Sequence, residues 1–469
     1  MQEEEFKKEI AQVKQCEWVR EEFHTAQFGD RRLFLRLLVV AEHLAKHPEA
    51  PINQASEVWK KTKAAYRFFD NKKVQPEFIS SPHVKRTIER INQQTEEVLI
   101  IQDTSFLNYS NMISSSDLGP IGKLHSSSMG LVMHTSMAIT AHGLPLGLLH
   151  QKIWARDPEE HGKAKSRAKK PIEDKESFRW LEALQDYTSR LPNRRKVITV
   201  CDREADIYDF FSEAEKIGTQ YLVRAKFNRC IPECPKLWEF MEEQEVVATE
   251  EILVPRQPGR TERTATIEIR YAPVTFRCPI DRPRGNKLPT VSLYAVYVNE
   301  QDPPLNVDEP LSWMLLTNVP TDSVQKAQLR TQWYKQRWQI EILHRILKSG
   351  CKVEHARLEK NHRRIPYLTL SSIIAWKLLM LTRFNRISPS APATVLLSQV
   401  ECDVLYSVTH SSSIKHREFN AKKATKWIAQ LGGYMARRSD PVPGSTHLWR
   451  GWQRLQDFTR MYALTKLQI

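Results

Sequence analysis

Two aspartates stand at the ends of two short apolar runs, and a glutamate lies far beyond them in the chain. Val98–Gln102 leads directly into Asp103, and Val197–Cys201 leads into Asp202. If the two runs are parallel neighbours in a sheet, both carboxylates emerge at its carboxyl edge, where α/β active sites usually lie. An aspartate after a strand is often only turn chemistry, so a catalytic interpretation depends on a third acid, Glu341.

The glutamate belongs to a segment with helical periodicity. Residues 321–349 contain neither proline nor glycine, so we expect one long helix that Gly350 stops. At about 100° per residue, its polar side chains fall within an arc of about 80°: Tyr334, Arg337, Glu341, His344 and Lys348. An ordinary amphipathic helix with ion pairs four residues apart would show the same pattern.

Three carboxylates of this kind suit phosphodiester chemistry. They could hold two Mg²⁺ ions roughly 4 Å apart, one activating a water or 3′-hydroxyl and the other stabilising the leaving oxygen. Carboxylate and water oxygens are the ligands that Mg²⁺ prefers. Arg337 and Lys348 would then bind flanking phosphates, and Tyr334 could donate a hydrogen bond to one.

Charge and cysteine content agree with a nucleic-acid partner in a reducing compartment. Lys and Arg number 70 against 55 Asp and Glu, a formal net charge of +15, and such an excess favours a polyanion. The 7 cysteines are scattered, with no zinc pattern. Met1–Glu9 lacks the apolar core of a signal peptide, so we expect a cytoplasmic protein that associates with its polyanionic partner there. The apolar stretch Leu368–Leu381 contains Lys377 and predicts a core helix, not a membrane span.

The elements that must position the acids divide the chain into three regions. Residues 1–75 predict a helical DNA-recognition domain, although a helical cap with solvated lysines fits equally well. Residues 76–375 predict an α/β catalytic domain with a mixed sheet, interrupted at 230–316 by a purely strand-like insertion. Residues 376–469 predict a helical C-terminal domain.

The spaced motifs resemble one known family. Tyr334-x2-Arg337-x3-Glu341-x6-Lys348 is similar to the Tyr-Arg-Glu-Lys signature of the insertion-sequence four branch of bacterial DDE transposases. The segments Gln102–Ser105 and Cys201–Asp206 resemble the surroundings of that family's two catalytic aspartates. The resemblance runs over nearly the whole chain and includes Tyr66–Phe68 near its start and four motif positions near its end: Gly432, Gly433, Trp449 and Trp452.

The resemblance implies a fold and a reaction. The fold is an RNase H-like core with a β-strand insertion, an N-terminal DNA-recognition domain and a C-terminal dimerisation region. The reaction is cut-and-paste transposition: cleavage of both strands at the transposon ends through a hairpin, then joining to target DNA within a homodimeric complex. Mg²⁺ is the implied cofactor, with Mn²⁺ expected to substitute.

It also implies further DNA contacts. Trp313 is similar to a residue on which a flipped base stacks, although a core strand residue is the plainer interpretation. Arg224 and Lys226 match phosphate contacts, and Arg36 and Arg67 match N-terminal DNA contacts. Two positions depart from the pattern: Arg345 replaces a lysine and keeps its charge and its expected phosphate contact, whereas Leu347 replaces a tryptophan.

Two other functions stay open at this point. The chain could regulate transposition by binding ends or forming heterodimers without chemistry, but the presence of all three carboxylates argues against this. It could also be an RNase H-like nuclease that performs no strand transfer. Glu204 and Asp206, just after the second aspartate, are interpreted as acids that support the site or begin a helix.

Overall fold

The structure is a computed structural model of the chain. It describes residues 17–56, 58–112, 117–122, 126–160, 170–232, 234–254, 262–279, 287–304, 307, 309–412, 418–440 and 442–466. The segment Met1–Glu9, which bears on the expected absence of a signal peptide, lies outside the described residues.

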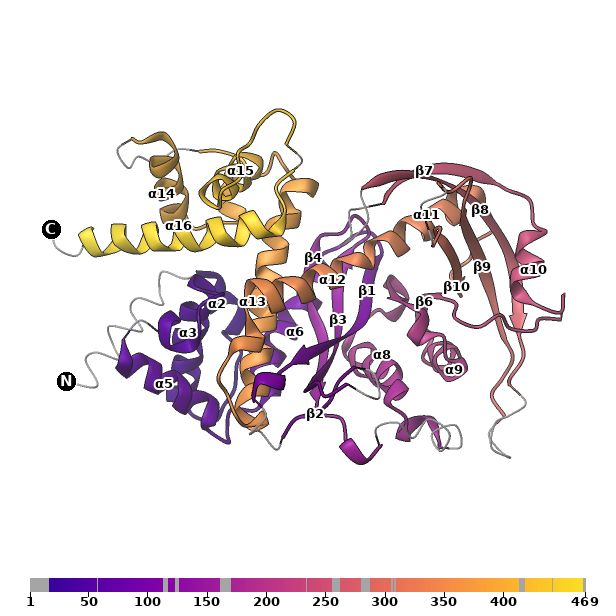
Figure 1. Cartoon of the computed structure of the whole chain (residues 1–469), viewed down its shortest axis with the longest axis horizontal. Helices are drawn as coiled ribbons and strands as arrows, with labels where there is room; N and C mark the ends of the chain where they lie inside the picture. The colour runs from indigo at the N-terminus through magenta and orange to yellow at the C-terminus, as the bar shows by residue number, and fades with distance from the viewer. Residues whose placement is uncertain are drawn as a thin grey trace.

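One mixed sheet runs through the middle of the molecule (Figure 1). Its strands are β1 (Val98–Asn108), β2 (Gly119–Pro120), β3 (Met129–Thr140), β4 (Pro145–Trp154), β5 (Val197–Cys201), β6 (Gln220–Arg224), β7 (Ala248–Val254), β8 (Arg263–Phe276), β9 (Val291–Glu300) and β10 (Ser312–Thr317). Their order is β2-β3-β1-β5-β6-β10-β9-β8-β7, with β4 paired to β3. Strands β1, β5 and β6 are parallel, and all other pairings are antiparallel. The predicted mixed sheet is therefore confirmed.

The region expected to be a purely strand-like insertion also contains a helix. Strands β7–β9 extend the sheet beyond β10, but α10 (Leu237–Glu242) precedes them. The prediction missed it because the helix is short. Its buried residues, Leu237 and Met241, lie four apart and so share one face.

Helices cover both faces of the sheet, and alternate residues of β1 show which face is which. Val98 and Ile100 pack in the core formed with α8 (Arg179–Arg190) and α9 (Tyr208–Ile217). Leu99 and Ile101 pack in the core that holds α12 (Trp338–Arg345) and α13 (Asn361–Ile387). Because side chains alternate along a strand, the residues of β1 after Ile101 also point alternately to these two faces.

The N-terminal and C-terminal regions are helical, as predicted. The first contains α2 (Glu17–Phe23), α3 (Arg31–Lys46), α4 (Ile52–Ala55) and α5 (Trp59–Asp70), and α6 (Pro76–Asn92) follows. The last contains α14 (Gln399–His410), α15 (Ala421–Leu431) and α16 (Ser445–Lys466). Both groups lie at the end of the molecule away from β7–β9 (Figure 1). They touch where the Trp452 indole donates to the Ala45 carbonyl at 3.1 Å.

The long apolar helix α13 joins these regions. It is long and apolar enough to cross a membrane, but 83% of its most apolar window is buried inside the protein. This burial agrees with the predicted core helix. The helix runs without a break through the expected domain boundary at 375/376.

A buried polar cluster ties the N-terminal helices to the sheet. His83 of α6 is fully buried, with Nδ1 2.5 Å from Glu22 Oε1 of α2, and its Nε2 accepts the Leu148 N–H of β4 at 2.8 Å. Arg90 pairs with the same glutamate and donates to the Leu146 carbonyl at 3.1 Å. Burial opposes ionisation of Glu22, but His83 and Arg90 lower its pKa to about 2. The cluster therefore holds a charged glutamate at a domain junction.

We predict that Glu22→Gln destabilises the protein at neutral pH by up to about 3 kcal/mol. The folded pKa of Glu22 lies below its ordinary value of 4.5. Its stabilising contribution is therefore complete above about pH 4.5 and is lost as pH falls towards 2. Denaturant unfolding at several pH values should show the difference from wild type shrinking over that interval. Glu21→Gln, at the exposed neighbouring position, is the control. An equal effect of both variants at every pH would contradict the prediction.

Candidate active site

Two neighbouring parallel strands lead to the two aspartates. Ile101 of β1 is opposite Val200 of β5, an offset of 99 residues. Carried two residues beyond the paired range, the same offset would bring Asp103 opposite Asp202, which follows the end of β5 (202 − 103 = 99). Asp103 continues the alternation of Leu99 and Ile101, so it faces the side of the sheet on which α12 packs. The two strands are parallel neighbours, which meets the condition on which the interpretation of the aspartates depended.

The sequence pattern suggested that the first strand ends at Asp103, but β1 continues past this residue. It continues to Asn108 because its other neighbour, β3, pairs with it over that whole length. Strand β5 ends at Cys201, as expected. Asp202 then caps a single helical turn, Arg203–Ala205, by accepting the Glu204 N–H on Oδ1 at 2.9 Å. The two aspartates therefore have different backbone settings.

The helix that carries Glu341 is not continuous, which corrects the expectation of one long helix. Helix α11 (Val324–Gln336) ends before Arg337, α12 begins after it, and a π-helical turn spans Ile346–Gly350. The Arg337 N–H bonds to the Tyr334 carbonyl three residues back at 3.0 Å, which tightens the turn. The Cys351 N–H bonds five residues back to Ile346 at 2.8 Å, which widens the last turn.

Arg337 lies between the acids. Its Nη2 is 2.5 Å from Glu341 Oε1, and its Nη1 is 3.9 Å from Asp103 Oδ1. Burial raises the pKa of Asp103 and Arg337 opposes this. The charges of Asp202 and Glu341 raise it further, to about 7. Asp103 is therefore both buried and repelled by the other two carboxylates, and one guanidinium offsets part of that repulsion.

Two more side chains of the helix face the same site. His344 is buried, with Nδ1 3.6 Å from Asp103 Oδ2. Burial, followed by the charges of Lys348 and Arg337, lowers the His344 pKa to about 3, so the ring is neutral. Burial also lowers the pKa of Lys348, against the opposite effect of Glu354 and Asp103. The polar arc predicted from periodicity therefore faces an enclosed site.

The donor set fits a hard divalent cation in ligand type and in charge. It offers carboxylate oxygens, the ligands that Mg²⁺ prefers, and their mutual repulsion favours a cation. Over the described ranges, however, no three His, Cys, Asp or Glu side chains already form a cation-binding group. Arg337 is the cation that now pairs with two of the acids.

Three of the residues expected to contact DNA lie together beside Arg337. The rings of Trp313 and Tyr334 meet edge to face with centroids 5.2 Å apart. Arg224 Nη2 donates to the Ser312 carbonyl at 2.8 Å, and its side chain also bonds to Tyr334. Burial raises the pKa of Tyr334. Trp313 is half-buried, so it is not a fully covered core residue.

The remaining expected contacts lie outside this cluster. Arg345 on α12 and Lys226 beyond β6 are exposed. Arg67 on α5 is exposed and Arg36 on α3 is half-buried. Helices α3 and α5 lie far to the left of β1 and α12 in Figure 1. The structure therefore brings Trp313, Tyr334 and Arg224 together, but not these four residues.

Asp206, which no spacing argument singled out for a specific role, fixes the loop after β6. Its buried carboxylate accepts the backbone N–H groups of Lys226 and Phe227 at 2.7 and 3.0 Å and pairs with Arg229 at 2.5 Å. The sequence signal for this residue was its closeness to Asp202 in the chain, but the residues that its carboxylate binds are distant in sequence. Asp206 thus links the second aspartate to the strand end that carries Arg224 and Lys226.

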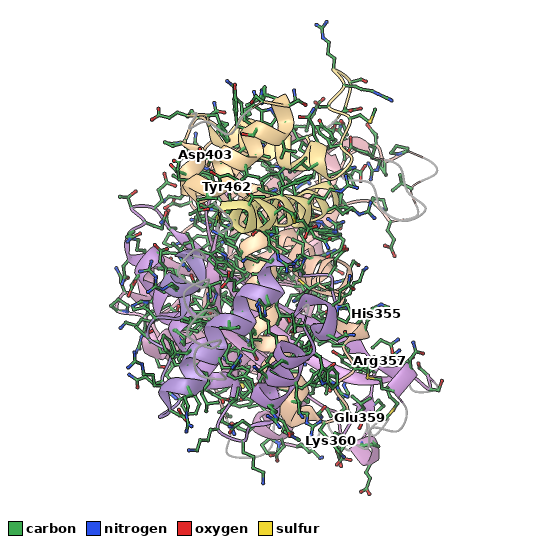
Figure 2. All side chains as sticks on the ribbon, turned by 90° about the vertical axis from the view of Figure 1, so that its left-hand side faces the viewer. His355, Arg357, Glu359, Lys360, Asp403 and Tyr462 are labelled. Carbon is green, nitrogen blue, oxygen red and sulfur yellow. The ribbon has the colours of Figure 1, made fainter. Side chains whose placement is uncertain are left out.

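A cavity of about 810 Å³ lies apart from the acids. It is bounded by α4, α5, the segment after the π turn, α13 and α16, and its lining includes Trp59, Lys352, His355 and Arg357. Figure 2 shows His355, Arg357, Glu359 and Lys360 following one another along the edge of the face that carries the N-terminal helices. The cavity therefore joins the N-terminal helices to the segment that follows Glu341.

Comparison with known proteins gives two family matches. The family described as Transposase DNA-binding matches residues 15–74, and the family described as Transposase DDE domain matches residues 154–376. The second match contains Asp202 and Glu341 and begins after Asp103. A DDE domain implies an RNase H-like α/β fold, with which the mixed sheet agrees.

A solved structure is also similar, at a low level. It is titled as a cryo-EM structure of a piggyBac transposase synaptic complex with hairpin DNA, and it is 8% identical, with a TM-score of 0.33. The match covers 82% of this chain and 57% of that one. Likeness at this level carries no argument about function.

We predict that Asp206→Ala frees the loop after β6. Loss of a buried ion pair's partner costs about 3–5 kcal/mol, and the amides of Lys226 and Phe227 lose their acceptor. Hydrogen–deuterium exchange should become faster at these two amides. Asp206→Asn keeps an acceptor but not the charge, and should have a smaller effect. Unchanged exchange in Asp206→Ala would contradict the assigned role.

Proposed function

The chain belongs to the DDE transposases, and on that premise we propose that it catalyses cut-and-paste transposition as a member of the insertion-sequence four branch. It binds the inverted-repeat ends of a transposon, cleaves both strands and joins the 3′-hydroxyl ends to target DNA. The observation that carries the proposal is the placement of Asp103 level with Asp202, with Arg337 pairing Asp103 to Glu341.

The DDE domain implies dependence on a divalent metal. Asp103, Asp202 and Glu341 would hold two Mg²⁺ ions, for which Mn²⁺ can substitute. Such ions lower the pKa of an attacking hydroxyl or water and stabilise the leaving oxygen. The elevated pKa of Asp103 supports this role, because it reports how strongly the site favours added positive charge.

The chain's own cations would bind the phosphates. Arg337 now pairs with two carboxylates, and a guanidinium can bind a phosphate in the same forked geometry. Lys348 lies in the π turn, where burial lowers its pKa. A phosphate beside it would favour its charged form. Both cations would thus hold the scissile strand over the acids.

A hairpin route is supported by the cluster of Trp313, Tyr334 and Arg224. A hairpin at a transposon end requires one base to leave the stack, and an aromatic face can receive it. Trp313 is partly exposed and fixed by the Tyr334 ring. Arg224 beside them supplies a positive charge for the adjacent phosphate.

The end DNA would approach from the N-terminal domain. Helix α5 presents Arg67 and a Trp59 side chain that is 77% exposed. The lining of the cavity next to it includes Lys352, His355 and Arg357. These three residues lie in one segment of the chain, C-terminal to Glu341. Although Lys352 pairs with Glu49 at 3.7 Å in this cavity, the concave surface with its Arg357 suits a duplex that passes from the recognition helices to the acids.

A second copy and a target duplex complete the proposal. The C-terminal helix α16 exposes Phe458 and Met461, at 41% and 60%, and exposed apolar side chains suit a protein contact. We propose that α14–α16 contribute to a homodimer in the synaptic complex. The protein would act in the cytoplasm on chromosomal DNA.

We predict that Asp103→Ala, Asp202→Ala and Glu341→Ala each abolish metal-dependent end cleavage and leave end binding intact. Binding is dominated by phosphate contacts elsewhere, so its affinity should fall steeply with salt. Gel-shift and cleavage assays on a labelled end with Mg²⁺ or Mn²⁺ measure both. Glu213→Ala on α9 is the control, because this acid pairs with Lys216 on the face of the sheet opposite α12. Cleavage that persists in Glu341→Ala would refute the assignment.

Capture of the excised ends by a target plasmid tests the last step. Joined products are expected, and free cut ends alone would favour a nuclease without strand transfer. End binding without any cleavage would favour a regulator.

We predict that Trp313→Ala lowers hairpin yield from an already nicked end, whereas nicking itself continues. Loss of base stacking costs about 1–3 kcal/mol. Trp313→Phe keeps an aromatic face and should retain most of the yield. Single-turnover assays on nicked substrates give the measurement. Equal yields from the alanine variant and wild type would count against base stacking at this residue.

A further inference from the structure

A buried polar network lies behind the two aspartates, on the opposite face of the sheet. Gln102 and Thr104 flank Asp103 on β1 and therefore point away from α12, towards α8. His134 of β3 lies opposite Thr104. Its Nδ1 is 2.9 Å from Thr104 Oγ1, and its Nε2 is 3.1 Å from Gln102 Oε1. The imidazole ring of His134 therefore contacts the side chains of both residues that flank Asp103.

Arg179, the first residue of α8, joins this network to the second aspartate. Its Nε donates to Thr104 Oγ1 at 2.9 Å, and its Nη2 donates to Glu204 Oε2 at 2.5 Å. Its Nη1 donates to the Glu176 carbonyl at 2.9 Å. The guanidinium is 9% exposed, and each of its three nitrogens donates a hydrogen bond. It is therefore not arranged to bind a phosphate.

The two residues that Arg179 holds are those that set the aspartates. Thr104 is the next residue after Asp103, so fixing its side chain fixes the roll of β1 and the direction of the Asp103 carboxylate. Glu204 provides the N–H that Asp202 Oδ1 accepts at 2.9 Å. Displacement of Glu204 would therefore move the cap that orients Asp202.

We propose that Arg179 is a positioning residue that sets the separation and direction of Asp103 and Asp202 for a shared cation, an inference that rests on the proposed function. The guanidinium is a planar fork whose donors have fixed relative directions. A site for a metal requires its ligands to be held to about 0.5 Å by the residues around them. The Thr104 hydroxyl accepts a hydrogen bond from Arg179 and can donate its own proton to His134 Nδ1. The positions of Arg179 and His134 are therefore coupled through this hydroxyl.

The contact between Arg179 and Glu204 acts more by fixing the position of Glu204 than by electrostatic attraction. The Glu204 side chain is 57% exposed, so solvent screens its attraction to Arg179. The Thr104 contact is part-buried and therefore less screened than the Glu204 contact. Thr104→Val should therefore reproduce much of the effect of losing Arg179, because it removes the hydroxyl and keeps the shape of the side chain.

The test compares cation binding in wild type and in Arg179→Ala, Arg179→Lys and Thr104→Val, each bound to an end duplex. Free Mn²⁺ measured by electron paramagnetic resonance gives the dissociation constant without reference to activity. We expect Arg179→Ala to weaken Mn²⁺ binding by about 10- to 100-fold, with end binding unchanged and cleavage recovered at high Mn²⁺. Arg179→Lys, which lacks the fork, should recover only part of the affinity.

Arg190→Ala is the matched control, because Arg190 lies at the other end of α8 and pairs with Asp186 at the surface. Wild-type Mn²⁺ affinity in both folded Arg179→Ala and Thr104→Val would overturn the inference, as would an equal loss in Arg190→Ala. If Arg179→Ala does not fold, the result for Thr104→Val decides alone.

The same experiment separates this inference from the proposed function. Wild-type protein that binds Mn²⁺ in an Arg179-dependent way but never cleaves an end would refute the proposed function and support the positioning role. Wild-type protein that binds no Mn²⁺ would overturn both.

Discussion

Burial of Asp103 beside two like charges is the constraint on which the candidate site depends. Burial raises the pKa of Asp103, and the charges of Asp202 and Glu341 raise it further against the opposing charge of Arg337, to about 7, so the fold must supply both the framework and the balancing charge. Arg337 supplies that charge in the structure. The guanidinium offsets the negative charge of the carboxylates, but their oxygens cannot coordinate it as they would a metal ion. The site is therefore stabilised and still favours a divalent cation.

The framework comes from the two faces of one sheet. Parallel pairing of β1 and β5 sets the aspartates level, α12 delivers Glu341 from one face, and the network of Arg179, Thr104 and His134 supports β1 from the other. The helix break at Arg337 and the π turn after Arg345 lie on either side of Glu341. Departures from regular α-helix often mark functional positions, and here they lie at Arg337 and Lys348, the two cations on either side of Glu341.

The strands beyond β6 and the terminal helices bring distant residues to the same region. Pairing of β10 with β6 puts Trp313 beside Arg224, and Asp206 fixes the loop that follows β6. At the other end, Glu22, His83 and Arg90 lock the N-terminal helices against β4. The recognition domain is therefore attached through a charged, buried junction, which makes its position relative to the acids well defined.

The sequence alone determined the apolar strands that lead to the two aspartates and the polar arc around Glu341, because local periodicity carries them, whereas the choice of these three acids rested on a family resemblance. Tertiary structure decided what local patterns cannot carry. It extended β1 past Asp103 through pairing with β3, divided the helix at Arg337, and inserted α10 among the strands. It also brought His344, Arg179 and Asp206 to their partners. Their partners lie tens to hundreds of residues away in the chain, and only folding makes such contacts.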